Sequence, residues 1–440
     1  MIEPRPSLRP RLTLALLTLV YVVNFVDRQL VGILGQPMKA ELGLSDTQLG
    51  LLGGVAFALF YTVLGLPIAR LAERRSRVGI VAISLAAWSA MTALCGMAAG
   101  FPHLLLARIG VGVGEAGCAP PSQSLVADLY PPEQRATALS ILSLGIPAGM
   151  LLGAVAGGWV AQTLGWRTAF VALGLPGIVL AGVIARVLKE PPRGTFDPPA
   201  TSTGFGTVLR TLLARPAFLH MAAGASLASF AGYGLTSFAV PLLVRRFDLP
   251  LANAATGYGL VAGVGIGIGI GAGGWIGDRI GGRVKGGPGL VALIGVLVAA
   301  SLFQIALAQT APLAFAAFAL LPLIGAHLYF GPTYGVTVNS VGPRERATAV
   351  AILLMAMNAI GLGLGPLAVG ALSDHLARAA APELVAICRA APTTKLCLAQ
   401  SGYALTRALR FDLLVYLWAA LHFWLAARAL ARDQPQSSVR

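Results

Sequence analysis

Charged residues are scarce in this sequence, and their scarcity excludes most classes of protein. Only 11% of the 440 residues are Asp, Glu, Lys or Arg, whereas a soluble domain usually carries about 25%. Hydrophobic residues make up 56%, and the mean hydropathy is +0.78. Roughly 246 apolar residues are about what twelve membrane helices of about 20 residues need. The composition excludes a soluble enzyme and a disordered chain, and it predicts one integral membrane unit.

Cysteines and catalytic motifs are also few. Four cysteines are too few for a disulfide scaffold. Cys95 and Cys118 lie in apolar runs and are expected to be packing residues. Cys388 and Cys397 share a hydrophilic loop, where they form either a disulfide, which an oxidising exterior permits, or two free thiols. The sequence shows no nucleophile–base set, no metal-ligand spacing and no phosphate-binding Gly-x-x-x-x-Gly-Lys-Ser/Thr motif. We therefore expect no catalytic residue, no metal and no cofactor.

Acidic residues number 17 against 32 Lys and Arg, which gives a net charge of +15. The basic residues are scattered in short clusters between apolar runs, so no nucleic-acid partner is expected. Three arginines precede the first apolar run, as in a signal peptide, but no small-residue cleavage site follows. We therefore interpret this run as an uncleaved first membrane helix.

The apolar runs are too long and too continuously hydrophobic for the strands of a membrane barrel, so they predict twelve helices. With both termini in the cytoplasm, the cytoplasmic segments hold 21 Lys and Arg and the outer segments hold 9. This asymmetry follows the positive-inside rule and supports that orientation. The helices are predicted at 12–36, 48–71, 78–99, 103–127, 135–163, 168–188, 217–244, 253–277, 288–308, 311–339, 346–373 and 405–431.

The predicted helices divide six and six. Residues 191–216 contain two Pro-Pro pairs and a Thr/Ser/Gly tract, which is the composition of a linker. We predict an N-terminal six-helix bundle at 1–190, a cytoplasmic linker at 191–216 and a C-terminal six-helix bundle at 217–440.

The two halves repeat each other. The motif Pro-Glu-Gln-Arg-Ala-Thr-Ala at 132–138 returns as Pro-Arg-Glu-Arg-Ala-Thr-Ala at 343–349, an offset of 211 residues. An acid–Arg pair at 73–74 returns at 278–279, an offset of 205. A duplicated, pseudo-symmetric pair of bundles explains both repeats. Paired halves are typical of secondary transporters, whose site lies between them.

The acid–Arg loops resemble the major facilitator superfamily, whose loop pattern is Gly-x-x-x-Asp-Arg-x-Gly-Arg. Residues 69–77 match it with Ala69, Glu73 and Ser76 as departures, and 274–279 match its first half. The details of the first half resemble the spinster-like branch: Asn-Phe-Val-Asp-Arg at 24–28, and Arg-Ile-Gly-Val-Gly-Val-Gly-Glu-Ala at 108–116. The resemblance implies a transporter fold and, in animal members, sphingosine-phosphate or lysophospholipid cargo.

The charged residues Asp27, Arg28, Arg108 and Glu115 lie inside apolar predicted helices. Such groups are costly in lipid unless they pair or face water. Arg108 and Glu115 are seven residues apart and share one helix face. Burial favours the neutral form of a carboxylate and a nearby Arg favours the charged form, so movement of an Arg would switch protonation. We predict these four as proton-coupling residues; the alternative is a permanent ion-pair clamp.

The two intramembrane arginines also suit bidentate contacts to phosphate, so we predict a headgroup role for Arg28 and Arg108. Helices 7 and 10 carry polar, uncharged side chains that suit an amphipathic substrate, although the same side chains serve ordinary interhelical hydrogen bonds. The predicted substrate-binding residues are Asn24, Arg28, Arg108, Tyr233, Ser237, Tyr329 and Tyr334.

Seven charged residues at cytoplasmic helix ends form a predicted gating latch. In the family that the sequence resembles, such loops hold the two halves together when the cytoplasmic side is closed. The alternative is the positive-inside bias combined with helix capping. The predicted latch residues are Glu73, Arg74, Arg77, Arg135, Asp278, Arg279 and Arg346.

Together these features predict a proton-coupled secondary transporter that works by alternating access in a bacterial inner membrane. Its expected partners are protons, the lipid bilayer and a small amphipathic lipid of the lysophospholipid or sphingosine-phosphate kind, and we expect a monomer. One alternative is transport of small organic anions or drugs. A second is a lipid-binding membrane protein that does not transport.

Overall fold

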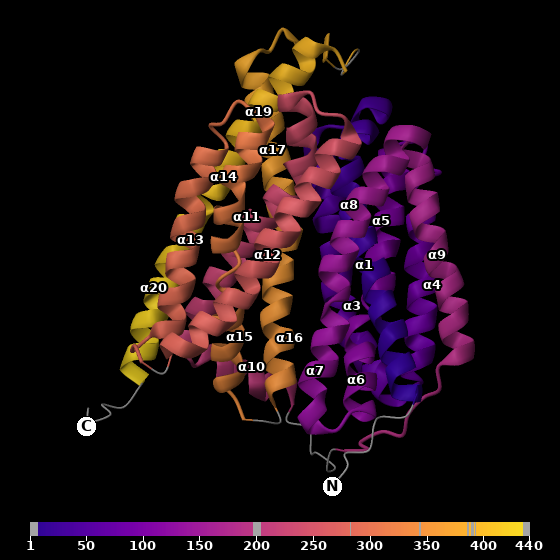
Figure 1. The fold of residues 1–440 in the computed structure, drawn as a ribbon, viewed down its shortest axis with the longest axis vertical. Coiled ribbons are helices and arrows are strands. Elements are labelled where there is room, and N and C mark those ends of the chain that lie inside the picture. The colour runs from indigo at the N-terminus through magenta and orange to yellow at the C-terminus, as the bar shows by residue number, and fades with distance from the viewer. Residues whose placement is uncertain are drawn as a thin grey trace. The chain divides into compact units, whose positions relative to one another are not determined.

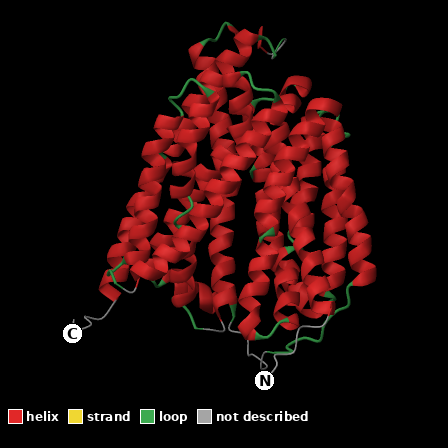
Figure 2. Cartoon of the chain, in the orientation of Figure 1, coloured by secondary structure: helices red, strands yellow, loops and turns green. Residues whose placement is uncertain are grey.

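Every regular element that the described residues form is a helix (Figure 2). The structure is a computed structural model, and it describes residues 8–196, 204–281, 283–342, 345–384, 387–388, 391 and 393–433. Pro343 and Arg344 of the predicted repeat lie outside the described residues. Eleven helical segments are long and apolar enough to cross a membrane. This confirms the all-helical membrane fold.

The chain separates into two compact units. Unit 1 comprises Met1–Leu44, Val55–Ala200 and Pro250–Gly259, and unit 2 comprises Ser45–Gly54, Thr201–Leu249 and Leu260–Arg440. Each unit therefore includes a short segment that the sequence repeat assigns to the other half. These segments are α2 in unit 2 and the start of α12 in unit 1.

Figure 1 labels the helices of unit 1, which are α1 and α3 to α9. The first nine residues of α12 complete the unit, and within it the Ala252 amide donates to Gln162 Oε1 (2.8 Å). The unit contains α1 (Leu8–Leu42), α3 (Val55–Arg74), α4 (Arg77–Cys95), α5 (Phe101–Glu115), α6 (Ala119–Leu129), α7 (Pro132–Ser143), α8 (Gly145–Leu164) and α9 (Trp166–Val187).

One predicted helix of unit 1 is broken in two. The sequence predicts a continuous helix over 103–127, but α5 ends at Glu115 and α6 begins at Ala119. Pro120 and Pro121 lack the N–H groups that a continuous helix would use, and they occupy the first turn of α6, where those groups have no helical partner in any case. Each piece is too short to span, which explains why eleven segments and not twelve pass the length criterion.

Unit 2 contains more interrupted helices. A π-helical stretch, η2, separates α16 from α17, and α19 ends two residues before α20 begins. The unit contains α2 (Asp46–Gly53), α10 (Phe205–Leu213), α11 (Pro216–Phe247), α12 (Leu251–Gly281, from Leu260 onward), α13 (Gly287–Ala306), α14 (Pro312–Gly325), α15 (Phe330–Asn339), α16 (Arg346–Met357), η2 (Asn358–Leu364), α17 (Gly365–Ala380), α19 (Lys395–Leu413) and α20 (Val415–Asp433).

The predicted linker contains a helix. Val208 and Leu212 of α10 are fully buried and pack with Phe218, Ala349 and Ile352 in one cluster of unit 2. The apolar residues of α10 are four apart and so share one face. The start of the predicted segment 191–216 is Pro-rich, as expected for a linker. The second part of the segment is an amphipathic helix that packs on unit 2.

Candidate functional site

A buried ion pair joins two helices of unit 1. Arg28 Nε on α1 donates to Glu115 Oε2 at the end of α5, at 2.7 Å. The Glu115 side chain has no exposed surface, whereas 17% of the Arg28 side chain is exposed. The carboxylate therefore depends on a partner that solvent or a ligand is able to reach.

Asp27 lies beside this pair, and it is fully buried. Thr92 on α4 donates its hydroxyl hydrogen bond to Asp27 Oδ2 at 3.2 Å. Glu115 and Arg108 both act electrostatically on the Asp27 carboxylate, and Arg108 is 2% exposed. The structure thus gathers all four predicted proton-coupling residues into one network of α1 and α5, with α4 at its side.

Aromatic rings surround the Arg28 guanidinium. Its Cζ lies 5.1 Å from the ring centroids of Phe25 and Phe57 and 4.7 Å from that of Tyr61. Arg108 also contacts Phe57, with its Cζ 5.5 Å from the ring centroid. Cation–π contacts stabilise a guanidinium in an apolar setting. The site therefore combines a cation with apolar surface, and such a surface is able to contact both parts of an amphipathic anion.

The predicted substrate-binding residues fall in both units, each described separately. In unit 1, Asn24 is buried one turn before Arg28 on α1. In unit 2, Tyr329 is buried, and its hydroxyl lies 3.0 Å from Ser229 Oγ. Tyr233, Ser237 and Tyr334 are half-buried in the same unit. A role in binding stays a prediction for all of them.

Arg77, a predicted latch residue, lies in a cluster inside unit 1. Its side chain is 1% exposed; it donates to Asp128 on α6, and its Nε donates to Glu190 Oε1 at 2.7 Å. The Val78 amide also donates to Glu190 Oε2, at 3.0 Å. Burial alone would raise the pKa of Glu190, but the hydrogen bonds from Arg77, the Val78 amide and Ser76 lower that pKa below its ordinary value. The cluster ties α4 and α6 to the segment that follows α9.

The remaining predicted latch residues lie mainly on the surface. Arg135 donates to the Ala127 carbonyl within unit 1 at 2.8 Å, and Arg279 stacks on Trp275 in unit 2. Their participation in gating stays a prediction. Those that are exposed are Glu73, Arg74, Asp278, Arg279 and Arg346.

Sequence reasoning missed a second buried ion pair, in unit 2. Arg245 at the end of α11 donates from both terminal nitrogens to the two oxygens of Asp46, each at 2.8 Å. Ser373 Oγ on α17 adds a third donor at 2.7 Å. Asp46 is 1% exposed and Arg245 is 3% exposed. The only sequence signal is an acid after a Ser at a helix start, which indicates a cap and not a distant partner.

The start of α2 is held from a second direction. Asp374 on α17 accepts hydrogen bonds from the Asp46 amide (3.0 Å), the Thr47 amide (2.8 Å) and the Thr47 hydroxyl (2.6 Å). A carboxylate at a helix N-terminus also interacts favourably with the helix dipole. These contacts fix α2 on unit 2 at its first turn.

Asp412 is another buried acid that the sequence analysis did not select. It is 5% exposed on α19, and neither carboxyl oxygen has a hydrogen-bond partner. The sequence signal that could have selected Asp412 is a single acidic residue within an apolar run. Among the described residues, no group of three or more His, Cys, Asp or Glu side chains is placed to hold a metal ion. Cys388 and Cys397 form a disulfide.

Comparison with known proteins adds an independent line of evidence. The profile of the Major Facilitator Superfamily matches residues 17–376. The chain belongs to the major facilitator superfamily.

Among curated members, an MFS-type efflux pump of Mycolicibacterium smegmatis is 35% identical over 368 residues, which cover 82% of this chain and 83% of that protein. Protein spinster homolog 1 of Homo sapiens is 28% identical over 406 residues, 87% of this chain and 76% of the human protein. The spinster-like resemblance of the sequence is therefore confirmed, and the protein is a multi-pass membrane transporter of this superfamily.

A solved structure agrees with this placement. The crystal structure of a bacterial homolog to the human lysosomal transporter spinster, described as inward-facing and unoccupied, has a TM-score of 0.89 and 31% identity. The match covers 98% of this chain and all of that one. The predicted fold class, a twelve-span major facilitator fold, is thereby confirmed.

Proposed function

We propose that this protein is a proton-coupled secondary transporter that works by alternating access and carries amphipathic lipids with a phosphate headgroup, such as lysophospholipids or sphingosine phosphates. The observation that carries the proposal is the Arg28–Glu115 pair beside Asp27, buried within membrane helices. Intramembrane acids of this kind mark proton pathways.

The geometry supports coupling through competition for Arg28. An anionic headgroup that reaches the exposed part of Arg28 would draw the guanidinium away from Glu115. A carboxylate that loses its counter-ion in a low-dielectric site is more stable when protonated. Glu115 would then accept a proton. The neighbouring charges of Asp27 and Arg108 would influence the equilibrium between its charged and neutral forms. Release of the headgroup would return Arg28 and expel the proton.

The surroundings of Arg28 support an amphipathic cargo. The three rings around the guanidinium offer contact to an acyl or sphingoid chain next to the phosphate. In the second unit, Tyr233, Tyr329 and Tyr334 offer polar groups without charge. These residues, with Asn24 and Ser237, form the binding set of the proposal.

The proposal assigns gating to charges at both membrane surfaces. The proposal assigns the cytoplasmic latch to the exposed acid–Arg pairs in the last turns of α3 and α12. The Asp46–Arg245 pair with Asp374 holds α2 at the other surface and would have to open when the protein faces outward. The functional halves remain 1–190 and 217–440, joined by 191–216. We place the protein in a bacterial inner membrane as a monomer with both termini in the cytoplasm.

A second candidate function is proton-coupled transport of small organic anions or drugs. The efflux-pump relative at 35% identity favours it. The same Arg28 site would bind a carboxylate in place of a phosphate.

The test uses purified full-length protein in liposomes with an imposed pH gradient. Labelled lysophosphatidylcholine, sphingosine-1-phosphate and an organic-anion dye are followed in parallel. Wild type is compared with Asp27→Asn and Glu115→Gln. Glu41→Gln is the matched control, because Glu41 lies on the same helix as Asp27 but its side chain is 54% exposed.

Gradient-driven lipid flux in wild type and in Glu41→Gln, reduced at least about tenfold in both test variants, is the expected result. A tenfold reduction in flux corresponds to about 1.4 kcal/mol. We expect loss of a coupling group to reduce flux by more than this. Flux that responds to neither the gradient nor the mutations would overturn the coupling. Flux of the dye alone would transfer the proposal to the second candidate.

A further inference from the structure

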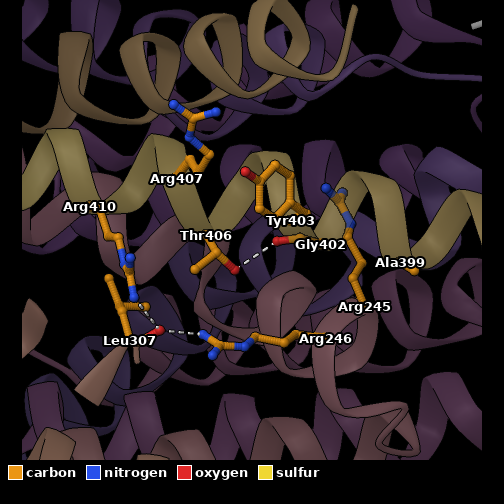
Figure 3. A pocket seen from close by; sticks show the side chains of 9 residues that line it. All are labelled: Arg245, Arg246, Leu307, Ala399, Gly402, Tyr403, Thr406, Arg407 and Arg410. Atoms are coloured by element: carbon orange, nitrogen blue, oxygen red, sulfur yellow. Dashed lines mark hydrogen bonds between the residues drawn. The ribbon is translucent and has the colours of Figure 1, made fainter. Parts of the chain in front are cut away.

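Four arginines surround a cavity of about 390 Å³ in unit 2 (Figure 3). Arg245 and Arg246 come from the end of α11, and Arg407 and Arg410 from α19. The other lining residues are Leu307, Ala399, Gly402, Tyr403 and Thr406. No acidic side chain lines the cavity.

Two of these guanidinium groups converge on one carbonyl oxygen. Arg246 Nη1 and Arg410 Nη2 donate to the Leu307 carbonyl at 2.7 and 3.1 Å, as Figure 3 shows. Arg246 also donates to the Gln309 carbonyl at 2.6 Å. Backbone carbonyls position both guanidinium groups but supply no net negative charge. Two like charges brought this close repel each other, and a bound anion would relieve that repulsion.

The cavity also retains hydrogen-bonding capacity. Arg410 Nε is buried without a hydrogen-bond partner, which is costly for a charged group. Arg407 is exposed and lies over the Tyr403 ring, 5.7 Å from its centroid. Arg245 differs from the others, because Asp46 already neutralises it. The anion would therefore be held by Arg246, Arg407 and Arg410.

The distribution of basic residues along the chain makes this cluster unusual. Under the proposed orientation the outer side holds only 9 of the 32 Lys and Arg residues, in keeping with the positive-inside rule. Four of those nine line this one cavity. The positive-inside rule gives no reason for four outer arginines to cluster around one cavity, whereas binding of an anion does.

We propose that this cavity is an anion-binding site for a phosphate group, distinct from the proposed transport site. Arginine forks bind phosphate oxygens in bidentate fashion, and basic pockets between membrane helices hold anionic lipid headgroups. A volume of about 390 Å³ is in the usual range for a small-molecule site. The phosphate belongs either to an anionic lipid of the outer leaflet or to a free anion.

The experiment measures binding to purified, delipidated full-length protein in two arms. One arm titrates inorganic phosphate by calorimetry. The other reconstitutes the protein in phosphatidylcholine nanodiscs with and without phosphatidylglycerol and counts retained lipids by native mass spectrometry. The variants are Arg407→Gln and the double change Arg246→Gln with Arg410→Gln. Arg428→Gln is the control, because Arg428 is likewise exposed and stacks on an aromatic residue four positions earlier, Trp424.

We expect binding about tenfold weaker in Arg407→Gln and lost in the double variant, with Arg428→Gln like wild type. The exposed Arg407 makes the single variant informative even if the double variant folds poorly. Loss in the lipid arm alone identifies a lipid headgroup, and loss in the phosphate arm alone identifies a free anion. If neither probe binds wild type more tightly than Arg407→Gln, the anion site is wrong.

Discussion

Glu115 and Asp46 are both buried carboxylates paired with an arginine, but the two arginines differ in exposure. Arg28 reaches Glu115 through Nε and keeps 17% of its side chain exposed. Arg245 grips Asp46 with two parallel hydrogen bonds, and Ser373 adds a third donor. An arginine that a ligand can reach is suited to exchange its partner, whereas a fully buried arginine is not.

The Asp46 pair allows a stability prediction. Asp46→Asn leaves Arg245 buried without its counter-ion, so we expect the free energy of unfolding to fall by about 3–5 kcal/mol. Unfolding of the detergent-solubilised protein by heat and by denaturant measures it. The double change Asp46→Asn with Arg245→Met should recover part of the loss, because it removes the unpaired charge. Strictly additive losses in the double variant would contradict a direct pair.

How far sequence predicts these residues depends on how local their partners are. The seven-residue spacing of Arg108 and Glu115 and the neighbouring Asp27 and Arg28 are visible in the chain, and the structure brings all four together. Asp46 meets Arg245 and Asp374 across 199 and 327–328 residues. Periodicity and capping rules carry no information over such separations, so this pair required the structure.

Among the elements, the interruptions of helices were harder to predict than the helices. Pro120 and Pro121 are plain in the sequence, yet the predicted helix runs through them, because an apolar run of membrane length outweighs two prolines in a hydropathy argument. The break places Glu115 at the end of α5. Similarly, the sequence analysis did not predict α10, because the prolines and the Thr/Ser/Gly tract of 191–216 indicate a linker. The buried face of α10 consists chiefly of Val208 and Leu212.

The cluster of Arg77, Asp128 and Glu190 predicts a pH-dependent connection between elements. The pKa of Glu190 is lowered from its ordinary value of 4.5, so the cluster stabilises unit 1 at and above that pH. The stabilisation is lost as the pH falls through the lower, folded-state pKa. We expect the difference in melting temperature between wild type and Glu190→Gln to be largest near neutral pH and to shrink below about pH 4.5.

Differential scanning fluorimetry from pH 3 to 7 (about four pH units) in one detergent measures this difference. Glu73→Gln serves as the control, because Glu73 is an exposed acid on α3. A constant difference between wild type and Glu190→Gln across the whole range would show that ionisation of Glu190 does not stabilise the cluster.

At the scale of the whole molecule, the proposed alternating-access cycle requires α2 to leave its place beside α17 and the end of α11. We predict that a cross-link between Thr47→Cys and Asp374→Cys, whose native side chains are in hydrogen-bond contact at 2.6 Å, abolishes transport. Reduction should restore it. Flux in liposomes before and after oxidation is the measurement.

The matched control joins two helices of unit 2 that pack together. His220 on α11 and His422 on α20 lie 3.1 Å apart through their Nδ1 atoms. A cross-link between His220→Cys and His422→Cys should leave transport unchanged, and it also controls for reduction of the native Cys388–Cys397 disulfide. Equal inhibition of transport by both cross-links would contradict the prediction that movement of α2 is specifically required.

The placement of α2 has a consequence for synthesis of the chain. Asp46 and Thr47 leave the ribosome long before Asp374, which follows 328 residues after Asp46. At about 5–20 residues per second, the first turn of α2 waits roughly 16–66 s for its partner. Arg245 follows Asp46 after 199 residues, so Asp46 lacks both partners for roughly the first 10–40 s of that interval. The first turn of α2 therefore completes its contacts only after α17 has been made.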